Sequence, residues 1–260
     1  MFHDALVSFA ERWDIYMVKQ KPKIIYENTV PGNFVRRINR FTAEVLIDGK
    51  PEMVHVKNTG RLQELLVPDA KVTLQKTLNP NRKTAYDLIS VYKSELKWVN
   101  IDSLAPNALM KQQLMSLNYE LVKPEYTYGE SRIDFYMERD GERFLTEVKG
   151  CTLADDLHLG IGLFPDAPTE RGVKHLHELT KAAKEGYHCS IAFVIQMNGI
   201  HRVMPNEAAQ PEFKEALVKA AKEGVQIVCY SCHVEADSIK ITGVVEDTSR
   251  FVEAQRRKSE

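Results

Sequence analysis

The sequence predicts two folded parts, a small β-barrel followed by an α/β sandwich with a mixed central sheet, so the whole chain is of the α/β (α+β) class. Three observations predict this. The length of 260 residues allows two domains. Residues 21–103 carry short alternating strands and little helix, which is typical of a small barrel of the OB type. Within residues 104–247 the order αβββαβ and then αβ is typical of a sandwich.

The barrel strands are indicated by alternation and by turn residues. Residues 41–47 alternate between the two faces of a strand, and Asp48–Gly49 then predicts a two-residue hairpin turn into a strand at 53–56. Further strands are expected at 71–78 and 85–92.

Other segments lie beside or outside these strands. Residues 60–66 are expected to form one or two helical turns that end before Pro68. Residues 1–20 have the apolar spacing of an amphipathic helix, which we expect as an N-terminal extension. The tail at 248–260 is expected to be mobile.

The second part alternates helices with strands. Thr169 is a favoured N-cap residue, and the apolar spacing that follows it predicts a long amphipathic helix. The expected helices are 105–117, 169–185 and 213–222, and the expected strands are 119–126, the hairpin 131–149, 190–197 and 225–230.

The hairpin around Asp140–Gly141 is the most informative stretch of the chain. Asp-Gly between two alternating runs predicts a two-residue turn, so opposed residues have numbers that sum to 281. Asp134 then lies opposite Glu147, and Arg132 lies opposite Lys149. Since side chains alternate with a period of two, these four share one face of the hairpin.

Two carboxylates opposed across a ladder repel each other unless a proton or a cation lies between them. Oxygen ligands of this kind suit Mg²⁺ or Mn²⁺, and an acid followed on the next strand by Glu-x-Lys is the pattern of PD-(D/E)xK nucleases. The alternative is a set of cross-strand ion pairs on a solvated face. From the hairpin alone both interpretations stay open.

Several longer motifs are similar to those of one family. The resemblance spans roughly residues 30–240 and is to the sugar fermentation stimulation protein A family. Lys57 and Gly150 stand where that family usually has Pro and Ser. The motifs are Asn58–Gly60, Ser131–Phe135, Glu147–Leu153 and Phe164–Leu179. The resemblance implies an OB-like domain, a PD-(D/E)xK-type domain, DNA binding and a nuclease activity.

A nuclease of this kind assigns roles to particular side chains. Asp134 and Glu147 are the expected metal ligands for Mg²⁺ or Mn²⁺, and Lys149 is the expected partner of the attacking water and of the transition state.

Further side chains are weaker candidates for the same site. Glu170, Arg132 and Lys174 are possible additional members. For Glu170 the alternative is a favourable place at a helix N-terminus with an ion pair to Lys174. Asp166 is either a loop cap or a group that supports the site, and both interpretations stay open. His175 and His177 are given no role.

Basic residues point to a nucleic-acid partner. Residues 1–100 hold 16 Lys and Arg against 11 Asp and Glu, and residues 101–260 hold 19 against 25, so a basic first part precedes an acidic second part. The expected contacts to a nucleic-acid backbone are Arg36, Arg37, Arg40, Lys57 and Arg61.

The sequence also limits the setting. We expect a cytoplasmic protein with DNA as a partner, no membrane and a possible homodimer, because no export signal or apolar span is present. The segment Cys229–His233 has the spelling of a haem attachment site, but it lies in a predicted buried strand and is interpreted as plain strand. The competing function is a non-catalytic DNA-binding regulatory protein. A different α/β enzyme is disfavoured, since no phosphate-binding loop or nucleophile elbow appears.

Overall fold

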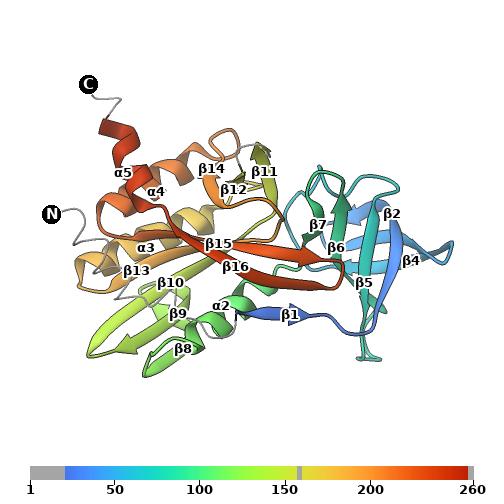
Figure 1. Cartoon of the computed structure of the whole chain (residues 1–260), viewed down its shortest axis with the longest axis horizontal. Helices are drawn as coiled ribbons and strands as arrows, with labels where there is room; N and C mark the ends of the chain where they lie inside the picture. Colours follow the sequence, from blue (N-terminus) through green and yellow to red (C-terminus); the bar gives the residue numbers. More distant parts are fainter. Residues whose placement is uncertain (1–20, 157–159, 257–260) are drawn as a thin grey trace.

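The computed structural model describes residues 21–156 and 160–256, with a β-barrel at one end and a larger α/β body at the other (Figure 1). Both predicted parts and their order along the chain are confirmed. The helix expected at 1–20 lies outside the described residues.

The barrel is a six-stranded sheet in the order β4-β3-β2-β5-β6-β7, and a parallel pairing of β4 with β6 closes it. The hairpin expected at Asp48–Gly49 is present, with φ of 50° and 75° at its two turn residues. The strands are β2 (Thr29–Asn39), β3 (Thr42–Ile47), β4 (Lys50–Val56), β5 (Lys71–Lys76), β6 (Tyr86–Lys93) and β7 (Lys97–Asn100).

The segment 60–66 forms a single turn, the shorter of the two expected lengths. The turn is closed by the Leu66 N–H, which donates to the Leu62 carbonyl at 2.8 Å. Leu62 itself has a positive φ of 50°, a conformation that does not continue a helix.

The large sheet has the order β1-β16-β15-β13-β10-β9-β8 and is mixed, because β13 pairs in parallel with both β10 and β15 while the other pairs are antiparallel. Its central strands are buried on both faces, which explains their unbroken apolar sequence. The strands are β1 (Lys23–Ile25), β8 (Leu121–Tyr128), β9 (Ser131–Arg139), β10 (Glu142–Cys151), β13 (His188–Ile195), β15 (Gln226–Glu235) and β16 (Ser238–Glu246).

Helices cover both faces of this sheet (Figure 1). On one face Leu109 of α2 belongs to the same buried cluster as Phe144 and Ala192. On the other face the three other described helices share a core with Leu145 and Ile191. The helices are α2 (Ala105–Met115), α3 (Glu170–Lys184), α4 (Pro211–Lys222) and α5 (Thr248–Arg256). A small sheet that the sequence did not predict consists of β11 (Leu153–Asp156), β12 (Ile161–Phe164) and β14 (Arg202–Pro205).

The structure bears on two of the expected boundaries. The first part of the expected tail forms α5, which packs on the body with Phe251 only 4% exposed. The chain also contributes to the large sheet before it enters the barrel, since β1 pairs with β16. The barrel domain therefore does not begin at residue 21.

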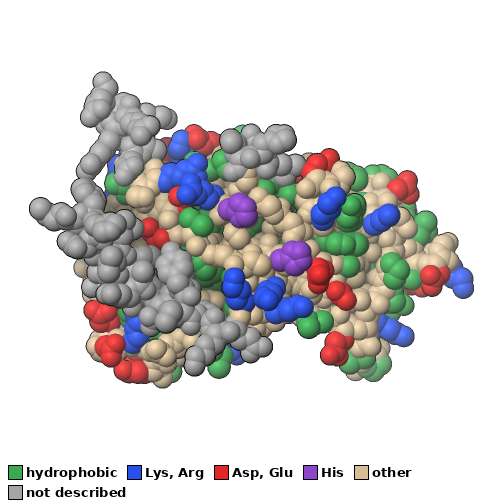
Figure 2. All heavy atoms as spheres, viewed as in Figure 1, with side chains coloured by type: hydrophobic (Ala, Val, Ile, Leu, Met, Phe, Trp, Pro, Cys, Tyr) green, Lys and Arg blue, Asp and Glu red, His purple; other side chains and the backbone are tan. Residues whose placement is uncertain are grey.

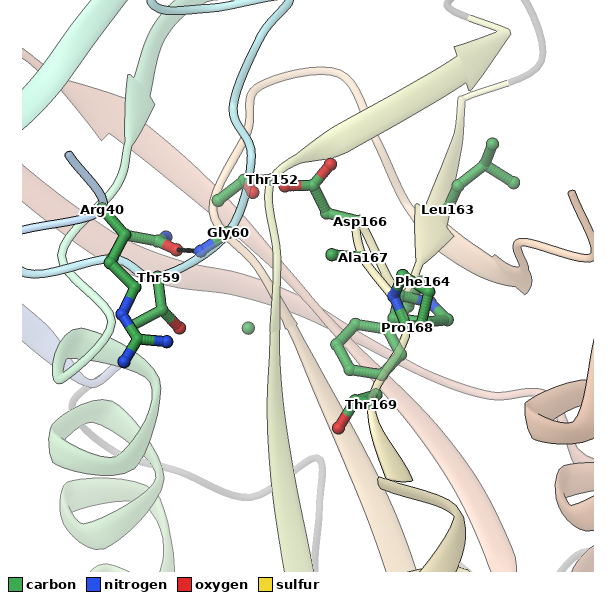
Figure 3. Close-up of a pocket in the computed structure, with 13 residues that line it drawn as sticks. Arg40, Thr59, Gly60, Thr152, Leu163, Phe164, Asp166, Ala167, Pro168 and Thr169 are labelled. Carbon is green, nitrogen blue, oxygen red and sulfur yellow. Dashed lines mark hydrogen bonds between the residues drawn. The ribbon is translucent and has the colours of Figure 1, made fainter. Parts of the chain in front are cut away.

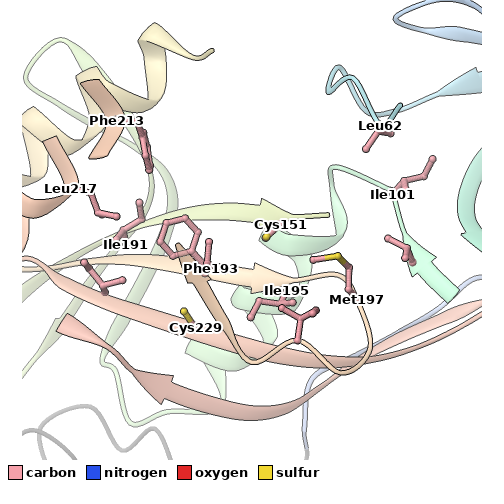
Figure 4. Close-up of a cluster of buried hydrophobic side chains, with 14 of the residues drawn as sticks. Leu62, Ile101, Cys151, Ile191, Phe193, Ile195, Met197, Phe213, Leu217 and Cys229 are labelled. Atoms are coloured by element: carbon pink, nitrogen blue, oxygen red, sulfur yellow. The ribbon is translucent and has the colours of Figure 1, made fainter. Parts of the chain in front are cut away.

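The barrel and the sandwich share a continuous interior (Figure 4). Leu62 and Ile101 belong to the same buried cluster as Ile195 and Met197 at the end of the large sheet. A chain of buried amides lies beside this cluster. Asn100 donates to the Tyr26 hydroxyl at 3.1 Å and accepts from Gln196 at 2.8 Å. The entry to the barrel and its exit are thus tied to each other and to β13.

All four cysteines are buried thiols, and burial raises the pKa of each to about 12. Cys229 and Cys232 lie within β15, which confirms their interpretation as strand residues. None of the described helices combines the length and the apolar character that a bilayer crossing requires.

Candidate active site

The hairpin of β9 and β10 has the register that Asp140–Gly141 predicts. Every ladder pair from Arg139–Glu142 to Phe135–Thr146 sums to 281, and both turn residues have a positive φ. The ladder ends at Phe135–Thr146, one pair before Asp134 would meet Glu147. Beyond that point the Asp134 carboxylate crosses to β10 and accepts a hydrogen bond from the Val148 N–H at 2.8 Å.

Glu147 is the most buried charged group of this region, with 2% of its surface exposed. Its Oε1 atom accepts from the Lys149 ammonium at 2.5 Å and contacts Nδ1 of His175. Its Oε2 atom is buried and has no hydrogen-bond partner among the described residues. Burial pushes the pKa of Glu147 upward, but the charge of Lys149 and the hydrogen bond from His175 outweigh it and hold the pKa below its ordinary value.

Asp134 lies within electrostatic reach of Glu147. Burial, and after it the charge of Glu147, raises the pKa of Asp134 above its ordinary value. Its second oxygen accepts a hydrogen bond from Asn107 of α2 at 2.8 Å. Two neighbouring carboxylates with one unsatisfied buried oxygen therefore share this end of the hairpin.

The residues fit a hard divalent cation in the kind of donor atom and in charge. A buried carboxylate oxygen without a partner carries a desolvation cost that a cation would remove. When both are ionised, Asp134 and Glu147 carry two negative charges against the single charge of Lys149. The set is small, since the described residues include no group of three or more His, Cys, Asp and Glu side chains arranged to hold a metal.

The structure adds His175, to which the sequence interpretation gave no role. His175 is 3% exposed, and its Nε2 faces the Arg171 Nε–H at 3.3 Å. A guanidinium only donates, so Nε2 is the acceptor and the ring proton is on Nδ1, which donates to Glu147. The spacing of four between Arg171 and His175 places both on one face of α3 and is the one sequence signal for this pair.

The chain matches two known domain families that adjoin each other. Residues 35–101 match the SfsA N-terminal OB domain, and residues 101–238 match the sugar fermentation stimulation protein RE domain.

The chain belongs to the sugar fermentation stimulation protein family.

Relatives in this family are similar over most of their length. The sugar fermentation stimulation protein homolog of Desulfitobacterium hafniense (strain DSM 10664 / DCB-2) is 45% identical over 218 residues, covering 83% of this chain and 94% of that protein. The homolog of Clostridium beijerinckii is 46% identical over 225 residues, covering 85% and 98%. Among solved structures, Pyrococcus furiosus SfsA in complex with Ca²⁺ has a TM-score of 0.76 and 26% identity, covering 87% of this chain and 98% of that one.

In this SfsA-family chain the other expected members of the acidic site lie apart from it. Arg132 pairs with Glu125 of β8 at 2.5 Å, so the expected opposition of Arg132 and Lys149 is not formed. Lys174 contacts the Glu130 carbonyl at 3.2 Å, and Glu170 is an exposed residue of the first turn of α3. None of these three contacts the Asp134–Glu147 pair in the described residues.

Two of the basic residues expected to bind nucleic acid are engaged within the barrel. The Arg37 guanidinium donates to five backbone carbonyls, and this ties the turn between β2 and β3 to the loop that follows β4; the acceptors are Asn39, Arg40, Asn58, Gly60 and Arg61. Lys57 is ion-paired with Asp87 at 3.4 Å and with Asp102 at 3.0 Å. Both side chains therefore stabilise the barrel.

Three basic residues remain accessible. Arg36 is exposed and paired with Glu44 at 2.7 Å, whereas Arg40 and Arg61 are exposed with no carboxylate partner among the described residues. The face shown in Figure 2 carries acidic and basic side chains interspersed, without a continuous band of Lys and Arg across its described part. On this face, nucleic-acid contact would therefore depend on a few individual cations.

Proposed function

We propose that this protein is a metal-dependent nuclease that hydrolyses phosphodiester bonds of DNA at the Asp134–Glu147 site. The observation that carries the proposal is the Glu147 Oε2 atom, which is buried beside a second carboxylate and lacks a partner among the described residues. A purely structural ion pair would satisfy both oxygens, because an unpaired buried oxygen costs about 1–3 kcal/mol.

Asp134 and Glu147 would hold Mg²⁺ or Mn²⁺. When bound there, the ion would polarise the scissile phosphate and lower the pKa of a bound water. The solved relative from Pyrococcus furiosus supports a divalent site in this family, since its structure is a complex with Ca²⁺, another cation that prefers oxygen ligands.

The chain's own residues then have distinct tasks. Lys149 contacts Glu147 at 2.5 Å, and its ammonium beside the acidic pair would orient the attacking water and offset the charge of the phosphate. His175 holds Oε1 of Glu147, which leaves Oε2 as the free donor atom. Asn107 and the Val148 N–H hold Asp134 in the same way.

A second candidate is a non-catalytic DNA-binding protein that regulates sugar metabolism. The observation that favours it is the small size of the acidic set, with no group of three potential metal ligands among the described residues. Under this candidate Lys149 neutralises Glu147 permanently, and the accessible arginines Arg40 and Arg61 hold DNA.

Cleavage assays with one matched pair of variants decide between the two candidates. The protein, its Asp134→Asn variant and its Asp140→Asn variant are incubated with labelled single-stranded and double-stranded DNA, in Mg²⁺, Mn²⁺ or chelator. Asp140 is the control, because it is an exposed carboxylate at the turn of the same hairpin.

The nuclease proposal expects metal-dependent cutting that Asp134→Asn loses and Asp140→Asn keeps. Binding without cutting by all three proteins contradicts it and supports the regulatory candidate. Binding that does not weaken as salt is raised would count against phosphate contacts altogether.

A further inference from the structure

A pocket of about 400 Å³ lies at the junction of the barrel and the sandwich (Figure 3). One wall is the barrel loop Asn58–Gly60 together with Arg40. The opposite wall consists of Gly150 and Thr152 at the end of β10 and of the segment 163–169 that leads into α3. The pocket therefore has one wall from each domain, and it is not part of the acidic site itself.

The walls are already held in place by hydrogen bonds. Asn58 accepts from the Gly60 N–H at 2.8 Å, and the loop carbonyls are fixed by Arg37. Asp166 spans the junction and accepts from the Leu62 N–H at 3.1 Å, so it holds the barrel loop from the opposite wall. At Gly60 a Cβ atom would lie only 2.8 Å from the Asp166 carboxylate. A ligand would thus meet an ordered pocket and would cause little loss of conformational entropy.

The polar groups left free in this pocket are suited to a phosphate. Arg37 holds the barrel loop from behind the lining, and Asp166 uses its Oδ2 atom to accept from Leu62, so the lining contains one carboxylate. Arg40 has no carboxylate partner in the described part of the chain. The hydroxyls of Thr59 and Thr152 likewise make no hydrogen bond to other described residues. One guanidinium with two hydroxyl donors is a set that binds phosphate oxygens.

The pocket adjoins the proposed cutting site along one strand. Gly150 directly follows Lys149 in β10 and stands three residues from Glu147, which is about 10 Å along an extended strand. A nucleotide neighbouring the scissile phosphate on the same nucleic-acid strand lies within this reach.

The size of the pocket selects the form of the substrate. A volume of about 400 Å³ is at the small end of ligand pockets and suits one nucleotide unit. A duplex, in which each nucleotide is paired and stacked with its neighbours, cannot place a single base in a pocket of this volume unless that base is first unpaired. The two walls belong to domains that share a packed core. This core opposes a movement of one domain away from the other that would widen the pocket for a duplex.

We propose that this junction pocket binds one unpaired nucleotide of a DNA strand, with the phosphate of that nucleotide at Arg40, Thr59 and Thr152. The substrate is then single-stranded or frayed DNA. The binding site stands on the pocket alone, whereas the statement that the bound strand is cut rests on the proposed nuclease function.

The test measures binding without cutting. Fluorescence anisotropy is recorded in chelator with a short labelled single strand and with the blunt duplex of the same sequence. The variants are Arg40→Gln and Thr152→Val, and the control is Arg143→Gln. Arg143 is an exposed arginine stacked on Tyr187 at 4.1 Å, as Arg40 is stacked on Phe41 at 4.8 Å, and it lies outside the pocket.

We expect the wild type to prefer the single strand and Arg40→Gln to weaken single-strand binding about tenfold, the loss of one charge-assisted hydrogen bond. Thr152→Val should weaken it less, and Arg143→Gln should not change it. Equal effects of Arg40→Gln and Arg143→Gln, or preference for the duplex, would overturn the proposal.

The two proposals fail in different ways. If the protein binds single strands through Arg40 and never cuts them, the pocket proposal holds and the nuclease proposal is wrong. If cutting depends on Asp134 but binding is unchanged in Arg40→Gln and Thr152→Val, the nuclease proposal holds and the pocket proposal is wrong.

Discussion

The barrel and the sandwich each bury a small cluster of charged side chains, and the clusters differ in how completely their charges are paired. In the barrel cluster, Lys57 and Arg82 balance Asp87 and Asp102, and each of the four carboxylate oxygens has a partner.

In the sandwich cluster, Asp134 and Glu147 face one ammonium, and Glu147 Oε2 has no partner among the described residues. A cluster in which every carboxylate oxygen has a partner stabilises the fold and has no free atom for a ligand. A cluster with an unpaired carboxylate oxygen still has an atom that can bind one.

The largest expected effect tests the unsaturated cluster directly. Glu147→Gln removes the negative charge that would face the metal, so we expect cleavage to fall about 10²–10³-fold. The amide keeps the shape of the side chain and can still accept from His175, but it loses the charge that pairs with Lys149, so we also expect a moderate loss of stability. Single-turnover cleavage in Mg²⁺ and thermal unfolding of the same samples measure the two effects. A large loss of stability without loss of cleavage would remove the distinction between the clusters.

The barrel cluster is expected to respond in the opposite manner. Lys57→Met leaves two buried carboxylates short of a cation and should lower the free energy of unfolding by about 3 kcal/mol. Urea unfolding measures the change. The matched control is Lys76→Met, an exposed lysine of the same barrel, for which we expect little change. Equal losses in both variants would show that the barrel cluster contributes no more than a surface charge.

His175 sharpens the comparison, because it explains which oxygen of Glu147 stays free. His175→Leu removes the bond to Oε1, and we expect Mn²⁺ affinity to fall about 10–100-fold by calorimetric titration. His175→Asn retains an N–H donor and should recover part of the affinity. His177→Leu, two residues away and exposed, serves as the control. An affinity that is the same in all three variants would exclude a positioning role.

The smallest effect concerns acid. Burial pushes the pKa of Asp87 upward, but the hydrogen bond from Arg82 and the charge of Lys57 outweigh it, so the pKa lies below its ordinary value. Asp87 therefore stabilises the fold above the unfolded pKa of about 3.9, and this contribution is lost as the pH falls through the lower folded value. Asp87→Asn should flatten the fall of Tm below about pH 4, with each 1 kcal/mol worth about 2–4 °C. An unchanged slope would mean that Asp87 is not linked to acid unfolding.

Local chemistry explains what the sequence could predict. Asp140–Gly141 fixes the β9–β10 register, since the two residues tolerate the positive φ that a two-residue turn requires. Thr169 marks the start of α3 because its hydroxyl accepts the Gly172 N–H at 3.0 Å. The barrel, the mixed sheet and the neighbouring positions of Asp134 and Glu147 follow from such signals.

Contacts between distant segments were not predictable. His175 meets Glu147 across 28 residues, and Lys57 meets Asp102 across 45, through the way in which separate elements pack. The sequence suggests that Lys57 and Arg37 are surface cations, but in the structure Lys57 pairs with two carboxylates and Arg37 donates to backbone carbonyls. β1 is three residues long, too short to show an alternating pattern, so its place in the large sheet could not be inferred.

The position of β1 makes the barrel an insertion between two segments of the sandwich, because the chain pairs with β16 before the barrel and returns to α2 after it. Tyr26 and Asn100 link the two crossings by a hydrogen bond. Cutting the chain after residue 101 would leave β1 with the barrel and take this edge strand away from the large sheet. The sandwich would then lack one of its strands, so the two parts cannot be separated by a single cut. The two chain crossings fix the distance between the barrel and the sandwich. A nucleic-acid strand that contacts both domains must span that fixed distance.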